Sequence, residues 1–103
     1  MTQRVGFVLW VKPDRVDDYE RAHREVWPEM LEALKGAGIR NYTIFRDGNR
    51  MFGYFEADDL AAAAEYLEQQ EVSTRWQDAM ADLLAERVPD AGPLPLAEIF
   101  RLD

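Results

Sequence analysis

The chain has 103 residues, 48% of them hydrophobic and 31% charged, which suits a single folded domain over residues 1–103 and excludes a disordered chain. Its net charge of −8 repels phosphate groups, so nucleic acid and anionic membranes are not expected as partners, whereas a small neutral molecule is not repelled. The absence of cysteine excludes disulfides, thiolate metal sites and a cysteine nucleophile. The first residues, MTQRVGFVLWVKPD, hold an apolar run too short for a signal peptide or a membrane span, so we expect a cytoplasmic protein.

The first predicted element is a strand at residues 4–12, RVGFVLWVK, which is rich in β-branched and aromatic residues and is ended by Pro13. Both of its faces are mostly apolar, so we expect each face to be covered. A helix is predicted next over residues 13–38, because Pro13 and the acids after it form a helix start and apolar residues follow at near-helical spacing. Pro28 interrupts that pattern, so we expect a kink or a restart directly after Trp27.

Residues 39–58, IRNYTIFRDGNRMFGYFEAD, predict two strands joined by a tight turn at Asp47, Gly48 and Asn49. A second helix is predicted from Asp58, because acids there precede four alanines, the best helix formers. This stretch therefore predicts a hairpin followed by a helix.

A third helical segment, STRWQDAMADLLAER, is predicted to begin at a capping Ser73 or Thr74 and to run to residue 87. Residues 88–96, VPDAGPLPL, hold three prolines and a glycine and predict a loop. The last residues, LAEIFRLD at 96–103, are again typical of a strand.

The predicted order is strand, helix, strand, strand, helix or split helix, strand. This βαββαβ order is typical of a ferredoxin-like α+β domain, in which one antiparallel sheet carries helices on one face. The second face of such a sheet is then left open. Because the first strand is apolar on both faces, we expect a homodimer that packs sheet against sheet as a dimeric α/β barrel.

His23 is the only histidine, and Tyr19 and Trp27 lie four residues before and after it. Residues four apart form one row along a helix, so these three side chains can share a pocket. An imidazole gives and takes protons near neutral pH, which makes His23 a candidate general acid/base. On spacing alone, however, the favoured interpretation is that His23 lies at the surface or at the edge of the core, and that the two aromatic residues pack in the core. One histidine without cysteine gives no metal-ligand spacing.

Two further aromatic residues are candidates for binding a ligand. Trp76 lies beside Arg75, and its indole could stack on the C–H face of a sugar ring, although core packing is favoured by the pattern alone. Tyr42 could point its hydroxyl into a cavity or pack with the alternation of its strand. No phosphate-binding loop and no GxSxG motif occurs, so nucleotide-binding and serine-hydrolase functions have no motif to support them.

The segments YERAHREVWPEM, IRNYTIF and STRWQDAM resemble the L-rhamnose mutarotase family, and the likeness extends over nearly the whole chain. The resemblance implies a dimeric ferredoxin-like fold and a cofactor-independent isomerase that interconverts the α and β anomers of a sugar. It also implies that His23 is the proton donor and that Tyr19, Tyr42 and the segment of Trp76 contact the sugar. Members of the family often have two adjacent tryptophans there, whereas here Trp76 is followed by Gln77, whose amide can hydrogen-bond a hydroxyl but cannot stack.

The departure at Gln77 leaves the preferred sugar open between L-rhamnose, fucose and other 6-deoxy sugars. Two other functions also stay open, because fold alone does not determine activity. One is a cofactor-free monooxygenase or lactone isomerase, which would need a large apolar cavity. The other is a non-catalytic module that binds a small molecule without changing its rate of reaction.

Overall fold

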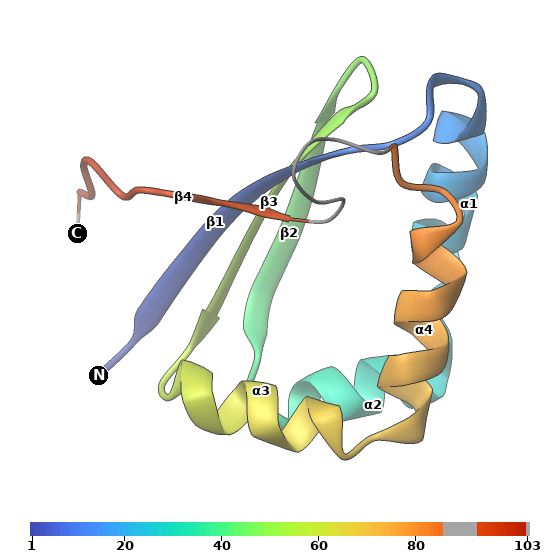
Figure 1. Cartoon of the computed structure of the whole chain (residues 1–103). Coiled ribbons are helices and arrows are strands. Elements are labelled where there is room, and N and C mark those ends of the chain that lie inside the picture. Colours follow the sequence, from blue (N-terminus) through green and yellow to red (C-terminus); the bar gives the residue numbers. More distant parts are fainter. Residues whose placement is uncertain (86–92, 103) are drawn as a thin grey trace.

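The computed structural model describes residues 1–85 and 93–102, and the chain follows the predicted order of elements (Figure 1). The elements are β1 (Gln3–Trp10), the short 3₁₀ helix η1 (Pro13–Arg15), α1 (Val16–Arg24), α2 (Pro28–Gly36), β2 (Arg40–Asp47), β3 (Arg50–Ala57), α3 (Leu60–Glu68), α4 (Glu71–Ala81) and β4 (Leu94–Leu96). Among these described residues, no helix has the length and apolarity needed to cross a bilayer.

The strands form one antiparallel sheet in the order β2-β3-β1-β4. Figure 1 shows the helices gathered on one side of this sheet, with α1 beside α4 and α2 beside α3. The predicted ferredoxin-like α+β fold is therefore confirmed. Alternation along β1 directs Phe7, Leu9 and Val11 toward the helices, where they join the main core, while Val8 lies on the opposite face.

The predicted break at Pro28 is confirmed, because α1 ends at Arg24 and α2 begins at Pro28 itself. Proline is tolerated at the first position of a helix, where its missing N–H would have no partner in any case. It also forces the residue before it out of the helical region, and Trp27 is extended, with φ −56° and ψ 131°. The first helix is therefore short, and its last turn carries His23.

The hairpin and the helix after it also form as predicted. Gly48 has a positive φ of 61° in the turn between β2 and β3, a conformation that glycine adopts without strain. Asp59 caps α3, and its Oδ1 accepts a hydrogen bond from the backbone N–H of Ala62 at 3.0 Å.

The predicted cap of the third helical segment is wrong. The helix α4 begins at Glu71, with Gln70 as its N-cap, so Ser73 lies within its first turn and is only 2% exposed. The backbone N–H of Ser73 already donates to the carbonyl oxygen of Gln70 at 3.1 Å, so this residue is inside the helix rather than at its boundary.

The same helix ends at Ala81 rather than at residue 87. Residues after Ala81 bond to the end of β1 instead of continuing the helix: the N–H of Lys12 donates to the carbonyl of Leu83, and the N–H of Ala85 donates to the carbonyl of Trp10, both at 2.8 Å. Pairing with the sheet therefore outweighs helix propensity here. The predicted end of the helix at residues 86–87 lies outside the described residues.

The predictions for the C-terminal region need correction as well. The predicted loop at residues 88–96 includes residues 88–92, which lie outside the described part, and its end forms strand β4, paired with Gly6, Phe7 and Val8. The predicted strand at 96–103 is wrong over residues 97–102, which are not in regular structure, while Leu96 belongs to β4 and residue 103 lies outside the described part. An alternating pattern predicts a strand, but a strand also needs a neighbour to pair with.

The helix-facing side of the sheet depends on one glycine. Phe7 is paired with Gly53 in the ladder between β1 and β3, and a β-carbon on Gly53 would lie 2.1 Å from Cζ of Phe7. The Phe7 ring, 6% exposed, therefore lies directly on the strand. The rings of Phe7 and Tyr42 pack edge to face, with 6.2 Å between their centroids, so the glycine also helps to place that tyrosine.

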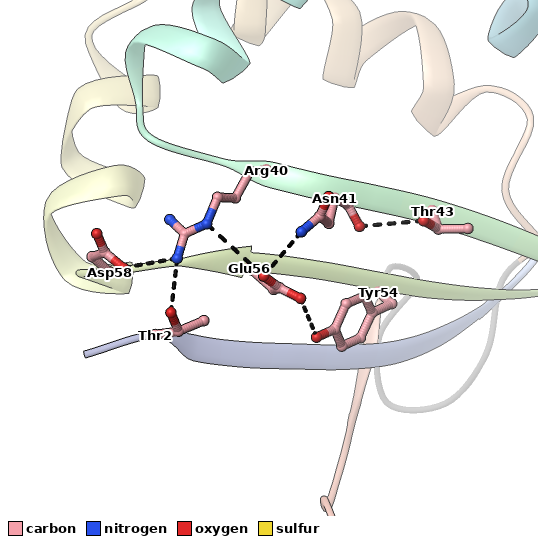
Figure 2. Close-up of polar contacts among 7 residues, drawn as sticks. All are labelled: Thr2, Arg40, Asn41, Thr43, Tyr54, Glu56 and Asp58. Carbon is pink, nitrogen blue, oxygen red and sulfur yellow. Dashed lines mark hydrogen bonds and ion pairs between the residues drawn. The ribbon is translucent and has the colours of Figure 1, made fainter. Parts of the chain in front are cut away.

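The sheet face away from the helices has an apolar row and a polar end. Val8, Phe52 and Phe45 are cross-strand neighbours on this face, and Phe45 is 67% exposed. Next to this row, Figure 2 shows Glu56 between Tyr54, whose hydroxyl donates to it at 2.6 Å, and side chains at the start of β2. The groups in this network are Thr2, Arg40, Asn41, Thr43, Tyr54, Glu56 and Asp58.

We expect Gly53→Ala to lower the free energy of unfolding by about 1–3 kcal/mol, because the new methyl group overlaps the buried Phe7 ring. Gly6→Ala is the matched control, since the nearest atoms to its β-carbon would lie at 3.9 Å. Denaturant unfolding followed by circular dichroism measures both. A Gly53→Ala variant as stable as the unsubstituted protein would contradict this account of the core.

Candidate active site

His23 lies in the last turn of α1, and its ring is held in one orientation by a hydrogen bond. Its Nδ1 lies 2.9 Å from the carbonyl oxygen of Tyr19. Because a carbonyl oxygen can only accept, Nδ1 carries the proton and donates it. In the neutral imidazole, Nε2 therefore has the free lone pair and is the nitrogen able to accept a proton.

Burial lowers the pKa of His23 from its ordinary value of 6.5, because the charged imidazolium loses hydration. The hydrogen bond to the carbonyl of Tyr19 acts in the opposite direction but is the smaller effect. At neutral pH the ring is therefore mainly neutral. His23 rests in the form that accepts a proton at Nε2 and can return it afterwards.

Tyr19 packs under the imidazole and anchors α1 in the main core. It is 5% exposed, and its ring centroid lies 4.3 Å from that of His23 with an angle of 30° between the planes. Burial, and to a smaller extent the neighbouring Tyr42, raise the pKa of Tyr19 strongly. Its phenol stays protonated, so it can donate or accept a hydrogen bond but is a poor proton source.

Tyr42 faces the helices because of a bulge at the start of β2. The register between β2 and β3 shifts between Arg40 and Thr43, and Asn41 there has a positive φ of 55°. The Tyr42 ring stacks on Phe55 at 5.1 Å. Although the residue is 43% exposed, partial burial of its hydroxyl raises its pKa, so this phenol also stays protonated.

Trp76, on α4, is a second aromatic neighbour of the His23 ring. Its ring centroid lies 5.4 Å from that of His23 and 5.1 Å from that of Trp27, edge to face in both pairs. Trp27 packs against the second core cluster, which contains Met30 and Val72. The aromatic contacts therefore lead from His23 through Trp76 to Trp27, and Trp27 packs against the second core cluster.

An open hollow of about 260 Å³ lies beside the imidazole, between α1 and β2. Its wall is formed by Tyr19, Glu20, His23, Arg24 and Ile44. Glu20 and Arg24 were missed in the sequence analysis, because nothing in the sequence distinguishes them from the other charged residues expected on the exposed face of a helix. Ile44 lies two residues after Tyr42, so alternation along the strand could have indicated that it shares the face of that tyrosine.

Gln77 lies apart from this group. It lines a second hollow of about 430 Å³ with residues of α3 and α4, and its Nε2 donates to Oγ of Ser73 at 3.5 Å. Neighbours in a helix point about 100° apart, so Trp76 faces His23 while Gln77 faces α3. The structure thus brings together Tyr19, His23 and Trp76 with Tyr42 nearby, but not Gln77.

No cluster of three or more histidine, aspartate or glutamate side chains that could hold a metal ion occurs within residues 1–85 and 93–102. The wall of the hollow carries one imidazole, the protonated phenol of Tyr19 and two charged groups, with the phenol of Tyr42 nearby. This set can move a proton and hydrogen-bond hydroxyl groups.

A family model described as L-rhamnose mutarotase matches residues 4–102. The L-rhamnose mutarotase of Pectobacterium carotovorum subsp. carotovorum (strain PC1) is 41% identical over 104 residues, which cover 97% of this chain and 98% of that protein. The crystal structure of L-rhamnose mutarotase from Formosa agariphila is similar, with a TM-score of 0.78 and 28% identity over 98% of this chain and 99% of that one.

Tetracenomycin F2 cyclase from Streptomyces glaucescens, a type II polyketide cyclase, has a TM-score of 0.66 at 20% identity, covering 98% of this chain and 97% of that one. At that identity the likeness concerns the fold alone. The family model and the curated relative, by contrast, each extend over nearly the whole length of the sequence. The chain belongs to the L-rhamnose mutarotase family.

Proposed function

We propose that the protein interconverts the α and β anomers of a 6-deoxy-hexose, with L-rhamnose as the first candidate, by acid/base ring opening and reclosure without a cofactor. The observation that carries the proposal is the neutral His23, whose Nδ1 is committed to Tyr19 and whose Nε2 is left to act beside the hollow. Membership of the family supports the substrate class. A cytoplasmic location, expected from the sequence, is part of the same proposal.

The reaction needs one group that first takes a proton and then gives it back. Nε2 of His23 takes the proton of the anomeric hydroxyl, the bond between C1 and the ring oxygen breaks as the C1 carbonyl forms, and the imidazolium protonates the ring oxygen. Both oxygens are attached to C1, so one nitrogen can serve both. After rotation about the C1–C2 bond, the same steps run in reverse on the other face of the aldehyde.

The tyrosines have a different role in this proposal. The raised pKa values of Tyr19 and Tyr42 disfavour a phenolate, so we assign them to hydrogen bonds with the sugar rather than to proton transfer. Trp76 supports the imidazole through its edge-to-face contact and offers an apolar surface to the C–H groups of the sugar. The small hollow, with charged and hydroxyl groups on its wall, fits a monosaccharide better than a large aromatic substrate.

We expect His23→Ala to abolish the acceleration of L-rhamnose mutarotation, a loss of roughly 10² to 10⁴ in rate, because it removes the imidazole from the wall of the hollow. Saturation-transfer NMR measures the exchange between anomers, with the uncatalysed rate as the baseline. Tyr19→Phe keeps the packing and should lose only part of the rate. Full acceleration by a folded His23→Ala variant would sink the assignment.

The lowered pKa of His23 fixes the direction of the pH dependence. The neutral ring is the active form of the free enzyme, so kcat/KM should be level across neutral pH and fall only below pH 6.5, as the ring becomes protonated. The folded protein also disfavours protonation of this ring, so its stability falls in the same window, and circular dichroism at each pH separates the two effects. A kcat/KM that rises as pH falls would instead make the imidazolium the active form.

We also propose a homodimer formed through the sheet face away from the helices. The apolar row of Val8, Phe52 and Phe45 on that face supports it: Val8 is buried, but Phe52 is half-buried and Phe45 is 67% exposed, and apolar side chains left accessible on a sheet face are typical of an interface. Exposed apolar side chains near the C-terminus, Ile99 and Phe100, add to the surface that a partner could cover.

Phe45→Asp should convert the dimer to a monomer, because it places a charge within the proposed interface. Leu31→Asp is the matched control: Leu31 is also exposed, at 42%, but lies on α2, on the helix side of the sheet. Light scattering coupled to size-exclusion chromatography gives the mass of each variant. A monomeric unsubstituted protein, or a dimeric Phe45→Asp variant, would contradict the proposal.

A further inference from the structure

Glu20 is the acidic group on the wall of the hollow, and it is tied to the sheet by an ion pair. Its Oε1 lies 2.5 Å from Nε of Arg46, which comes from β2. Its Oε2 lies 3.8 Å from Nη1 of Arg24, one turn along α1. The carboxylate therefore stands between helix and strand, at the opening beside His23.

The geometry gives this contact a role beyond stability. The side chains of Glu20 and Arg46 are 37% and 47% exposed, and ion pairs at such positions contribute only about 0–1 kcal/mol. The ion pair instead fixes the direction in which the Glu20 carboxylate points. Arg46 also donates from Nη1 to the carbonyl of Gly48 at 3.1 Å, so the guanidinium is held from both sides.

The two carboxylate oxygens of Glu20 are used unequally. Oε1 is engaged closely by Arg46, whereas Oε2 has only the looser contact with Arg24. A carboxylate has about four lone-pair positions and no proton to donate, so Oε2 can accept hydrogen bonds from neutral hydroxyl groups. Hydrogen bonds to a charged acceptor are roughly twice as strong as neutral ones.

The spacing on α1 matches the size of one sugar ring. Glu20 and His23 are three residues apart, which places their β-carbons about 5–6 Å from each other on the same side of the helix. With C1 at Nε2 of His23, the opposite edge of a pyranose, which carries the C3 and C4 hydroxyls, extends toward the carboxylate. Glu20 is thus placed to contact the part of the sugar that does not react.

We propose that Glu20 is a specificity-determining residue that accepts hydrogen bonds from the C3 and C4 hydroxyls of the sugar, and that Arg46 is the positioning residue that holds it. The inference rests on the proposed mutarotase function. Two acceptor contacts on adjacent hydroxyls distinguish their relative configuration, because an epimer directs one of them away from the carboxylate. A residue on the wall of the hollow, rather than Gln77, then sets the sugar preference.

The test measures kcat and KM for anomer exchange of L-rhamnose and of its C4 epimer, 6-deoxy-L-talose. Glu20→Ala should raise KM for L-rhamnose about tenfold or more with little change in kcat, and should reduce the preference for L-rhamnose over the epimer. Glu20→Gln keeps an acceptor oxygen and should fall between Ala and the unsubstituted protein. Arg46→Met should shift KM in the same direction by less, with partial recovery in Arg46→Lys.

Glu25→Gln is the matched control, since Glu25 is an exposed carboxylate next to the end of α1 that does not line the hollow. The inference is overturned if Glu20→Ala keeps the KM and sugar preference of the unsubstituted protein, or if it lowers kcat alone, which would indicate proton transfer. Failure of the unsubstituted protein to accelerate any sugar would instead overturn the proposed function. The two failures are therefore distinguishable.

Discussion

The hydrogen bond from Nδ1 of His23 to the carbonyl of Tyr19 is the contact on which the arrangement of the site depends. It fixes both the tautomer and the direction of the ring, so that Nε2 has the lone pair. The bond needs an intact helical turn from Tyr19 to His23, and the buried Tyr19 side chain secures that turn against the core. The edge-to-face contact with Trp76 also limits movement of the imidazole.

The end of α1 adds a second electrostatic effect. His23 occupies the last turn of the helix, where carbonyl groups carry the negative end of the helix dipole. Burial makes the resting ring neutral, while the dipole stabilises the positive charge that forms once the ring has taken a proton. The break before Pro28 matters for this reason, because a helix continuing through Trp27 would place its end farther from the imidazole.

Local sequence signals predicted much of this arrangement. Spacing put Tyr19 and His23 in one row, and Pro28 marked the restart. Contacts between distant segments were beyond such signals: Glu20 and Arg46 each read as a solvated charge until the strand is placed beside the helix. Gln77 illustrates a related limit of sequence signals. It is adjacent to Trp76 in the sequence, but consecutive side chains of a helix point in different directions, so it does not share the site of Trp76.

Strand β4 shows that local sequence signals are equally limited in predicting the strands of the sheet. A short run with Pro95 in its centre does not look like a strand, yet an edge position tolerates the missing N–H and β1 supplies the partner. The positive φ of Asn41, which turns Tyr42 toward the helices, likewise had no sequence signature, because asparagine adopts that conformation only in some contexts.

The presence of a single histidine has a practical consequence. Its ring protons and nitrogens give one set of imidazole signals in a magnetic resonance spectrum, free of overlap from other residues of the same type. The tautomer held by the Tyr19 carbonyl has its own nitrogen shift pattern, and a sugar bound in the proposed site would perturb those same signals. The protein thus carries a native spectroscopic reporter at the residue to which we assign the proton transfer.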